Sequence, residues 1–226
     1  MSCQDFRFKK GSTHIFSAPS GGGKTWRVMQ LIKHKNELIE DGSSISNVIL
    51  FYSVWQDIYS DMMNQGLIQK CIRKMPTQSE FETLMKSHVH KGGSIAIFDD
   101  LLSEVNQELS KIVLVSSRHL NTTSILLFQT LFSPNKFYRE ISLNVKYIHL
   151  FLNCRDTCQI QYLLRQVLSK NTGWAVRAYM NQTSKPYKCF LIDLTQHCEP
   201  QYRFRGDYLP SEKPMLIFVE KGTINI

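Results

Sequence analysis

The chain of 226 residues is 42% hydrophobic and 20% charged, which is typical of one globular domain with a sizeable core. It contains no apolar run of roughly 18 residues, the length that spans a membrane, and segment 1–16 lacks the apolar stretch of a signal peptide. We therefore expect no membrane contact, no secretion and a location inside a cell. The formal net charge of +8 favours a polyanionic partner, because Lys and Arg release counterions from a phosphate backbone.

The six cysteines lack the paired spacing that is typical of zinc sites. They are Cys3, Cys71, Cys154, Cys158, Cys189 and Cys198. A metal cluster of Cys154, Cys158 and the pair His197-Cys198 is one alternative, but small buried hydrophobic side chains are the favoured interpretation. We predict reduced thiols and no zinc.

The first strand candidate is Thr13–Ser17, which runs into a glycine-rich loop. Apolar residues then recur at helical spacing over Thr25–Ile39, and Gly42 fits the stop of that helix. The start of the chain is therefore predicted to have the order strand, loop, helix.

Further apolar runs rich in β-forming residues follow, with room for helices between them. The predicted strands are Asn47–Tyr52, Ser94–Phe98, Ser124–Phe128, Lys146–Leu152 and Lys188–Ile192. The predicted helical or polar segments are Asp57–Met75, Glu80–His88, Glu104–Val115 and Asp156–Leu168, with Asp156 as an N-cap. This alternation predicts an α/β fold with a mostly parallel sheet and helices on both faces. We expect a single domain over 1–226, in which 199–226 forms an extension of edge strands, since Tyr202–Ile226 alternates apolar and polar residues.

A Walker A loop follows the first strand. It consists of Ala18, Pro19, Ser20, Gly21, Gly22, Gly23, Lys24 and Thr25. Its glycines let backbone amides surround the phosphates, Lys24 reaches the β- and γ-phosphates, and Thr25 offers a hydroxyl to Mg²⁺. Ala18 replaces the first glycine, and we expect the loop to tolerate its methyl group if φ stays negative there. The alternative, a Gly-Ser turn before an unrelated helix, is disfavoured because the loop lies between a predicted strand and a predicted helix.

A Walker B pattern lies at the end of the strand Ser94–Phe98, where ligands of open α/β sheets bind. Asp99 is predicted to hold Mg²⁺, and Asp100 to orient and deprotonate the attacking water. Many such motors have Glu at the second position. A solvated turn is the alternative for two adjacent acids, but the Walker A loop upstream favours function.

Gln129 ends the next predicted strand and is placed to contact both the γ-phosphate and the water, although from spacing alone it is equally a polar residue that begins a loop. Hydrolysis in such sites usually needs an arginine, often from a neighbouring subunit. Arg118, Arg139 and Arg155 are candidates, each with the alternative of an ordinary surface or ion-paired arginine.

Five blocks, in this order and spacing, resemble the genome-packaging ATPases of Polinton/Maverick-like elements and adintoviruses. That family is related to poxvirus-type packaging ATPases within the FtsK/HerA superfamily. The blocks are the Walker A loop, IAIFDDLLSE (95–104), SSRHLNTTSILLFQTLF (116–132), REISLNVKYIHLFLNCRDTCQIQYLLRQVL (139–168) and SKPYKCFLIDL (184–194). The resemblance covers most of the chain.

The resemblance implies a RecA-like P-loop NTPase that uses ATP and Mg²⁺ to translocate double-stranded DNA into a capsid. It implies a ring of five or six subunits and docking on a capsid vertex or portal protein, in a host cell nucleus or cytoplasm, with association with the virion as an option. Gln129 matches the family's sensor glutamine, and Arg139, then Arg118, matches the intersubunit arginine. The chain departs from the family at Ala18 and at Arg118, where relatives often have histidine.

Three other functions stay open on the sequence. A cellular or plasmid FtsK/HerA-type translocase shares the core but normally adds modules that this chain lacks. A P-loop kinase for small molecules fits less well, because Asp99, Asp100 and Gln129 suit water activation. A basic DNA-binding protein with a relic nucleotide site is disfavoured by intact Lys24 and Thr25.

Overall fold

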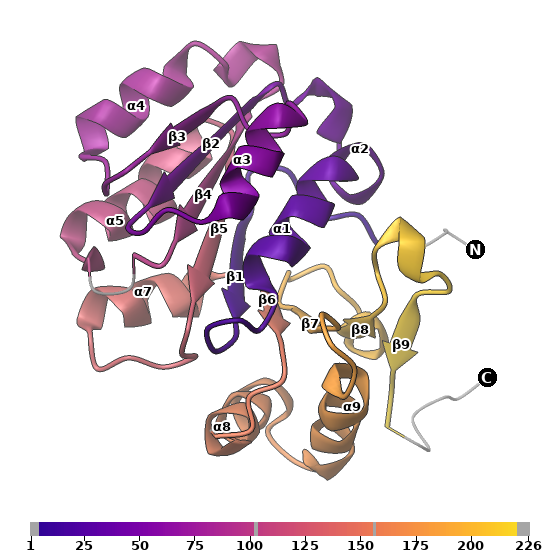
Figure 1. Ribbon diagram of the computed structural model, residues 1–226. Helices are drawn as coiled ribbons and strands as arrows, with labels where there is room; N and C mark the ends of the chain where they lie inside the picture. Colours follow the sequence, from indigo (N-terminus) through magenta and orange to yellow (C-terminus); the bar gives the residue numbers. More distant parts are fainter. Residues whose placement is uncertain (1–4, 102–103, 156, 221–226) are drawn as a thin grey trace.

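A nine-stranded sheet organises the described part of the chain (Figure 1). The computed structural model describes residues 5–101, 104–155 and 157–220. The strands are β1 (Thr13–Ser17), β2 (Asn47–Tyr52), β3 (Lys70–Ile72), β4 (Ser94–Asp99), β5 (Thr122–Phe128), β6 (Tyr147–Leu150), β7 (Phe190–Asp193), β8 (Phe204–Gly206) and β9 (Leu216–Phe218). Their spatial order is β3-β2-β4-β5-β1-β6-β7-β8-β9. The pairs from β3 to β6 are parallel and those from β6 to β9 antiparallel.

Helices cover both faces of this sheet, as predicted (Figure 1). They are α1 (Lys24–Lys33), α2 (Lys35–Leu38), α3 (Asp57–Asn64), α4 (Gln78–Lys86), α5 (Gln107–Lys111), α6 (Ser117–His119), α7 (Lys136–Asn144), α8 (Thr157–Leu168) and α9 (Gly173–Thr183). Buried residues of α1 and α3 pack on one face, and those of α4, α5, α7, α8 and α9 on the other. Because side chains alternate along a strand, Phe98 of β4 joins the second layer while Ile97 joins the first.

The predicted strands are confirmed with small shifts at their ends. The central ones are buried along their whole length, which explains why they appear in the sequence as continuous apolar runs. Three strands shift by up to two residues at an end: β5 starts at Thr122 instead of Ser124, β6 covers Tyr147–Leu150 instead of Lys146–Leu152, and β7 covers Phe190–Asp193 instead of Lys188–Ile192.

The predicted helix Thr25–Ile39 is two helices, because the helical conformation is interrupted at His34. Beyond the break, the backbone at 38–40 is taken up by the N-terminal segment: the Phe8 N–H donates to Leu38 O, and the Glu40 N–H donates to Phe8 O. This pairing competes with helical hydrogen bonds, so α2 ends at Leu38 and Gly42 belongs to a separate turn.

The predicted segment Asp57–Met75 is also two elements. Helix α3 ends before Gly66, whose φ of 67° is a left-handed conformation that glycine adopts without steric cost. The chain then forms β3, a strand of three residues that pairs with β2 alone. So short a strand carries no periodicity to read in the sequence.

Three further differences concern helices. In the segment Glu104–Val115, α-helical structure begins only after Asn106, whose side chain accepts from the Leu109 N–H at 3.0 Å. It continues as a π-helical turn over Ile112–Ser116. Helices α7 and α9 were not predicted. The predicted N-cap at Asp156 lies outside the described residues.

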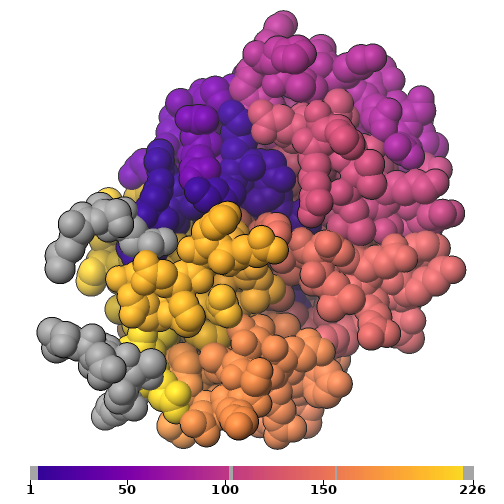
Figure 2. Space-filling model, turned by 180° about the vertical axis from the view of Figure 1, so that it is seen from behind, coloured from indigo at the N-terminus to yellow at the C-terminus, as the bar shows by residue number. Residues whose placement is uncertain are grey.

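The C-terminal segment contacts both helix α1, which follows the Walker A loop, and the N-terminal segment (Figure 2). Arg27 of α1 is fully buried and donates to both carboxylate oxygens of Glu212, at 2.6 and 3.0 Å. On β8, Arg205 donates to Phe6 O at 3.0 Å and ion-pairs with Asp193. These contacts tie β8 and the turn after it to the body of the sheet.

Candidate nucleotide-binding site

The loop between β1 and α1 has the backbone of a phosphate-binding loop. Gly21 and Gly23 have φ values of 73° and 90°, in the left-handed region that favours glycine. A Cβ at Gly23 would lie 2.7 Å from the Tyr187 ring. Helix α1 begins at Lys24, directly after Gly23, so its free N-terminal amides point into the loop.

Ala18 fits the loop in the way that we expected, with a φ that is not positive. Its side chain is buried, and its N–H donates to Phe128 O at 3.2 Å. A Cβ at Gly22 would lie only 2.7 Å from the Ala18 methyl and 3.0 Å from Pro19 O. The methyl of Ala18 is therefore accommodated because position 22 has no side chain.

Lys24 lies folded over the loop. Its ammonium donates to Ala18 O at 2.7 Å and to Pro19 O at 3.2 Å. Burial lowers the pKa of Lys24, while the charges of Asp99 and Asp100 act in the opposite direction. An anion that enters the loop offers the ammonium a stronger partner than two neutral carbonyls.

Asp99 ends β4 as a buried carboxylate that is held by three donors. Its Oδ2 accepts from the Thr25 hydroxyl at 3.0 Å, the Tyr59 hydroxyl at 2.8 Å and the Gln56 amide at 3.4 Å. Burial raises the pKa of Asp99, and the hydrogen bonds from Tyr59 and Thr25 oppose that shift. The predicted pair of Mg²⁺ ligands, Thr25 and Asp99, is thus in direct contact.

Asp100 is half-buried and contacts the amide of Gln129. The Gln129 Nε2 donates to Asp100 Oδ1 at 2.9 Å. Asp100 has a φ of 55°, a left-handed conformation that is uncommon for a non-glycine residue, and the Ser53 hydroxyl donates to its carbonyl at 3.0 Å. The turn after β4 therefore aims the second carboxylate across to the end of β5.

These groups line one pocket of about 560 Å³ at the carboxyl ends of the parallel strands. Its residues are Ser20, Gly21, Gly22, Gly23, Lys24, Thr25, Trp26, Val54, Gln56, Asp57, Ile58, Asp99, Asp100 and Gln129. The loop amides and the Lys24 ammonium fit a phosphate chain, and the hydroxyl and carboxylate oxygens of Thr25 and Asp99 are the hard donors that Mg²⁺ prefers. The residues present therefore fit a nucleotide with its cation.

No protein-family model matches the sequence, and no curated protein sequence matches it either. Solved structures match the fold. The DNA-packaging ATPase B204 of Sulfolobus turreted icosahedral virus has a TM-score of 0.54 at 14% sequence identity, over 94% of this chain and 98% of that chain. The genome-packaging NTPase B204 of Sulfolobus turreted icosahedral virus 2, in complex with ATP-gammaS, has a TM-score of 0.52 at 14% identity, over 92% and 96%. This chain has the P-loop ATPase fold.

In this P-loop ATPase fold, the candidate arginines lie apart from the pocket. Arg118 precedes β5 and so lies at the amino ends of the strands, opposite the P-loop, where it lines a smaller pocket with Lys146 and His197. Arg139 is exposed on α7, and Arg155 is exposed in the turn after β6. None of the three lines the P-loop pocket. An arginine that acts on a neighbouring subunit has no need to reach its own site, so their roles stay predictions.

Sequence reasoning missed Gln56 and Tyr59, which contact Asp99 from the segment after β2. Their signal is positional: β2 is the neighbour of β4, so residues that follow β2 lie at the same edge as the Walker B acids. It also missed Tyr187, whose ring lies 5.3 Å from that of Trp26 and against Gly23. Tyr187 packs on the loop from outside the P-loop pocket, where it lines a smaller cavity with Gly21 and Gly22.

The remaining predictions concern absences. The five cysteines within the described residues form no disulfide, and no group of three or more His, Cys, Asp or Glu side chains there is placed to hold a metal ion. None of the described helices is long and apolar enough to cross a membrane.

Proposed function

We propose that this chain is an ATP-driven motor that translocates double-stranded viral DNA into a capsid. The observation that carries the proposal is a pair of contacts beside the P-loop, Thr25 with Asp99 and Asp100 with Gln129. A site for nucleotide binding alone needs the loop and a metal ligand. Hydrolysis also requires a group that activates water, and Asp100, which contacts the Gln129 amide, is such a group.

The residues divide the chemistry between them. Lys24 and the loop amides bind the phosphates, and Thr25 and Asp99 would hold Mg²⁺, which when bound neutralises charge on the β- and γ-phosphates. Asp100 accepts the proton of the attacking water, and the Gln129 amide orients that water and the carboxylate. The arginine that stabilises the transferring phosphoryl group comes from a neighbouring subunit, with Arg139 as the first candidate and Arg118 as the second.

Three observations support DNA as the substrate that is moved. The five sequence blocks resemble packaging ATPases of Polinton/Maverick-like elements and adintoviruses, in the FtsK/HerA superfamily. The similar solved structures include a viral DNA-packaging ATPase and its counterpart bound to ATP-gammaS. The net charge of +8 suits a phosphate backbone. On this proposal the chain works as a ring of five or six copies, docked on a capsid vertex or portal protein inside a host cell.

The test is ATP hydrolysis by the purified chain with and without double-stranded DNA. We expect DNA to stimulate hydrolysis. Asp100→Asn should lower the rate by at least about 100-fold, as loss of a general base does. Lys24→Ala should lower it too, because the β- and γ-phosphates lose their ammonium partner. Asp61→Asn, an exposed carboxylate on α3 outside the pocket, is the matched control and should keep the wild-type rate.

Other outcomes decide between the alternatives. ATP binding and DNA binding without hydrolysis at any protein concentration would indicate a relic site in a DNA-binding protein. Transfer of phosphate to a small molecule instead of water would indicate a kinase. Stimulation by DNA without any protection of DNA by capsids in a packaging assay would favour a cellular or plasmid translocase.

A further inference from the structure

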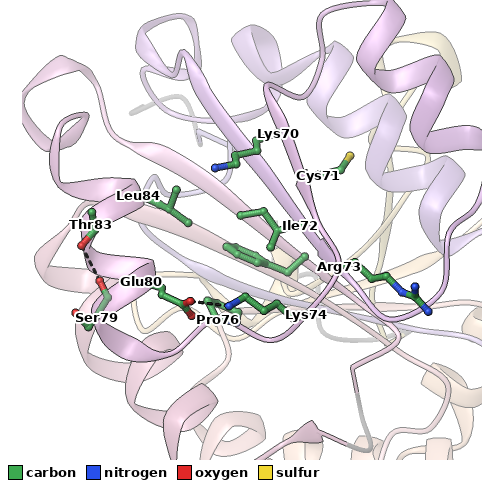
Figure 3. Close-up of a pocket in the computed structure, with 11 residues that line it drawn as sticks. Lys70, Cys71, Ile72, Arg73, Lys74, Pro76, Ser79, Glu80, Thr83 and Leu84 are labelled. Carbon is green, nitrogen blue, oxygen red and sulfur yellow. Dashed lines mark hydrogen bonds and ion pairs between the residues drawn. The ribbon is translucent and has the colours of Figure 1, made fainter.

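The edge of the sheet at β3 lies beside an apolar hollow, far along the sheet from the P-loop. Among the residues that the structure describes, β3 is the terminal strand of the sheet and pairs only with β2, so its outer edge carries backbone N–H and C=O groups without a strand partner there. The adjacent pocket has a volume of about 610 Å³ and lies between β3 and α4 (Figure 3).

The floor of this pocket is apolar. Phe51 of β2 is fully buried beneath it, and Ile72, Pro76 and Leu84 line its sides (Figure 3). Because side chains alternate along a strand, Lys70 and Ile72 share the face that looks onto α4, while Cys71 points to the other face, with its Sγ 3.6 Å from Met63 Sδ. An apolar side chain of another molecule could therefore pack against this apolar lining.

The rim of the pocket is basic. Lys70, Arg73 and Lys74 line it, and Glu80 is its one acidic residue. Glu80 pairs with Lys74 at 2.6 Å (Figure 3). Within the described part of the chain, the side chains of Lys70 and Arg73 make no ion pair or hydrogen bond. The rim therefore carries two cations without an acidic partner.

We propose that the β3 edge binds an extended acidic peptide segment of a partner protein, which adds to the sheet as a tenth strand. The open edge supplies backbone hydrogen bonds, the pocket takes one apolar side chain beside Ile72, and the cations select carboxylates on either side of it. Cross-strand pairing places one acid opposite Lys70, and a second acid just beyond the end of β3 lies near Arg73, which lines the same pocket. The recognised pattern is an apolar residue with acids two positions away on both sides, which reads the same in either strand direction.

The probe is a fluorescein-labelled peptide, Thr-Glu-Thr-Phe-Thr-Glu-Thr, and its control has Lys in place of both Glu residues. We expect fluorescence anisotropy to show saturable binding of the acidic peptide, with affinity falling as salt rises, and no binding of the basic one. Lys70→Glu should weaken binding about tenfold, because an attractive cross-strand pair becomes repulsive. Lys86→Glu, an exposed charge reversal on α4 outside the pocket, should leave binding unchanged.

A second measurement separates strand addition from charge attraction alone. Hydrogen exchange should slow at the backbone amides of 70–73 on peptide binding, and Thr83→Phe, which fills the pocket from the exposed side of α4, should weaken binding while the fold is kept. Equal binding by the wild type and Lys70→Glu, or unchanged exchange at 70–73, would overturn the proposal. So would self-association of the chain that Lys70→Glu abolishes, because the edge would then belong to a second copy.

The inference stands apart from the motor activity. Lys70 and Thr83 lie outside the P-loop pocket, so ATP hydrolysis without peptide should stay at the wild-type rate in both variants. A failure of hydrolysis in the wild type would leave the peptide measurement unaffected.

Discussion

At the scale of single residues, the P-loop is shaped by a mutual constraint between Ala18 and Gly22. The methyl of Ala18 occupies the space that a Cβ at position 22 would need, since the two would lie 2.7 Å apart. The loop thus keeps its shape without its first glycine because Gly22, which faces the added methyl, has no side chain.

We predict that Gly22→Ala destabilises the chain by about 1–3 kcal/mol, the usual cost of overpacking, and weakens ATP binding. The double variant Ala18→Gly/Gly22→Ala should recover part of both losses, because it removes the contact between the two Cβ atoms. Urea denaturation and ATP titration measure the two effects. Ala18→Gly alone is the control, and a double variant no better than Gly22→Ala would show that the contact with Pro19 O dominates instead.

At the scale of elements, the sequence predicts local structure and leaves spatial neighbours unassigned. The strands around the site are visible because they are long apolar runs, and Asp99 and Asp100 were found because they end one of them. The contact of Tyr59 with Asp99 depends on β2 lying beside β4, a tertiary pairing that no local pattern encodes. The short strand β3 was missed for the complementary reason, since it has too few residues for a period.

The link between α1 and the C-terminal turn gives a prediction at this scale. Arg27 has an exposed fraction of 0%, so its charge depends on Glu212 and on Tyr187 O, which accepts from it at 2.7 Å. Glu212→Gln should lower the free energy of unfolding by about 3 kcal/mol, because it leaves a buried cation without its anion. Glu199→Gln, at an exposed position, is the matched control in urea denaturation. Equal stability of the two variants would contradict the role of this link.

At the scale of the whole molecule, two buried histidines make stability depend on pH. The Nδ1 of His14 lies 3.2 Å from Nε2 of His149, and both rings are fully buried. Burial lowers the pKa of His14 to about 3 and that of His149 well below its ordinary value. Protonation is therefore easier in the unfolded chain than in the folded one.

We predict that this stabilisation is complete above about pH 6.5, the ordinary pKa of histidine, and is lost progressively as the pH falls toward the folded pKa values. Each histidine contributes a slope of up to about 1.4 kcal/mol per pH unit in that window. Urea denaturation between pH 7 and pH 5 measures the slope. His14→Asn should make it shallower, while His90→Gln, at an exposed position, should not change it.

The proposed ring of subunits leads to a separate prediction about the assembly. If Arg139 acts on a neighbouring site, Arg139→Ala and Lys24→Ala are each inactive alone, but a mixture regains hydrolysis because some interfaces combine an intact loop with an intact arginine. The rate per subunit should also rise with protein concentration. A mixture no more active than its components would exclude Arg139 from this role, and the same mixture with Arg118→Ala tests the second candidate.

The position of β1 determines when the site can form during synthesis. β1 lies at the centre of the sheet, yet its two neighbours come much later in the chain: Thr13 aligns with Ser124 of β5, and His14 with Tyr147 of β6. The P-loop itself depends on the Ala18 hydrogen bond to Phe128 O. Pairing over such separations is slow, so a growing chain leaves its central strand without either neighbour while more than half of the protein is made. A ribosome-bound fragment that ends before Phe128 will therefore bind no nucleotide, however complete its Walker A sequence.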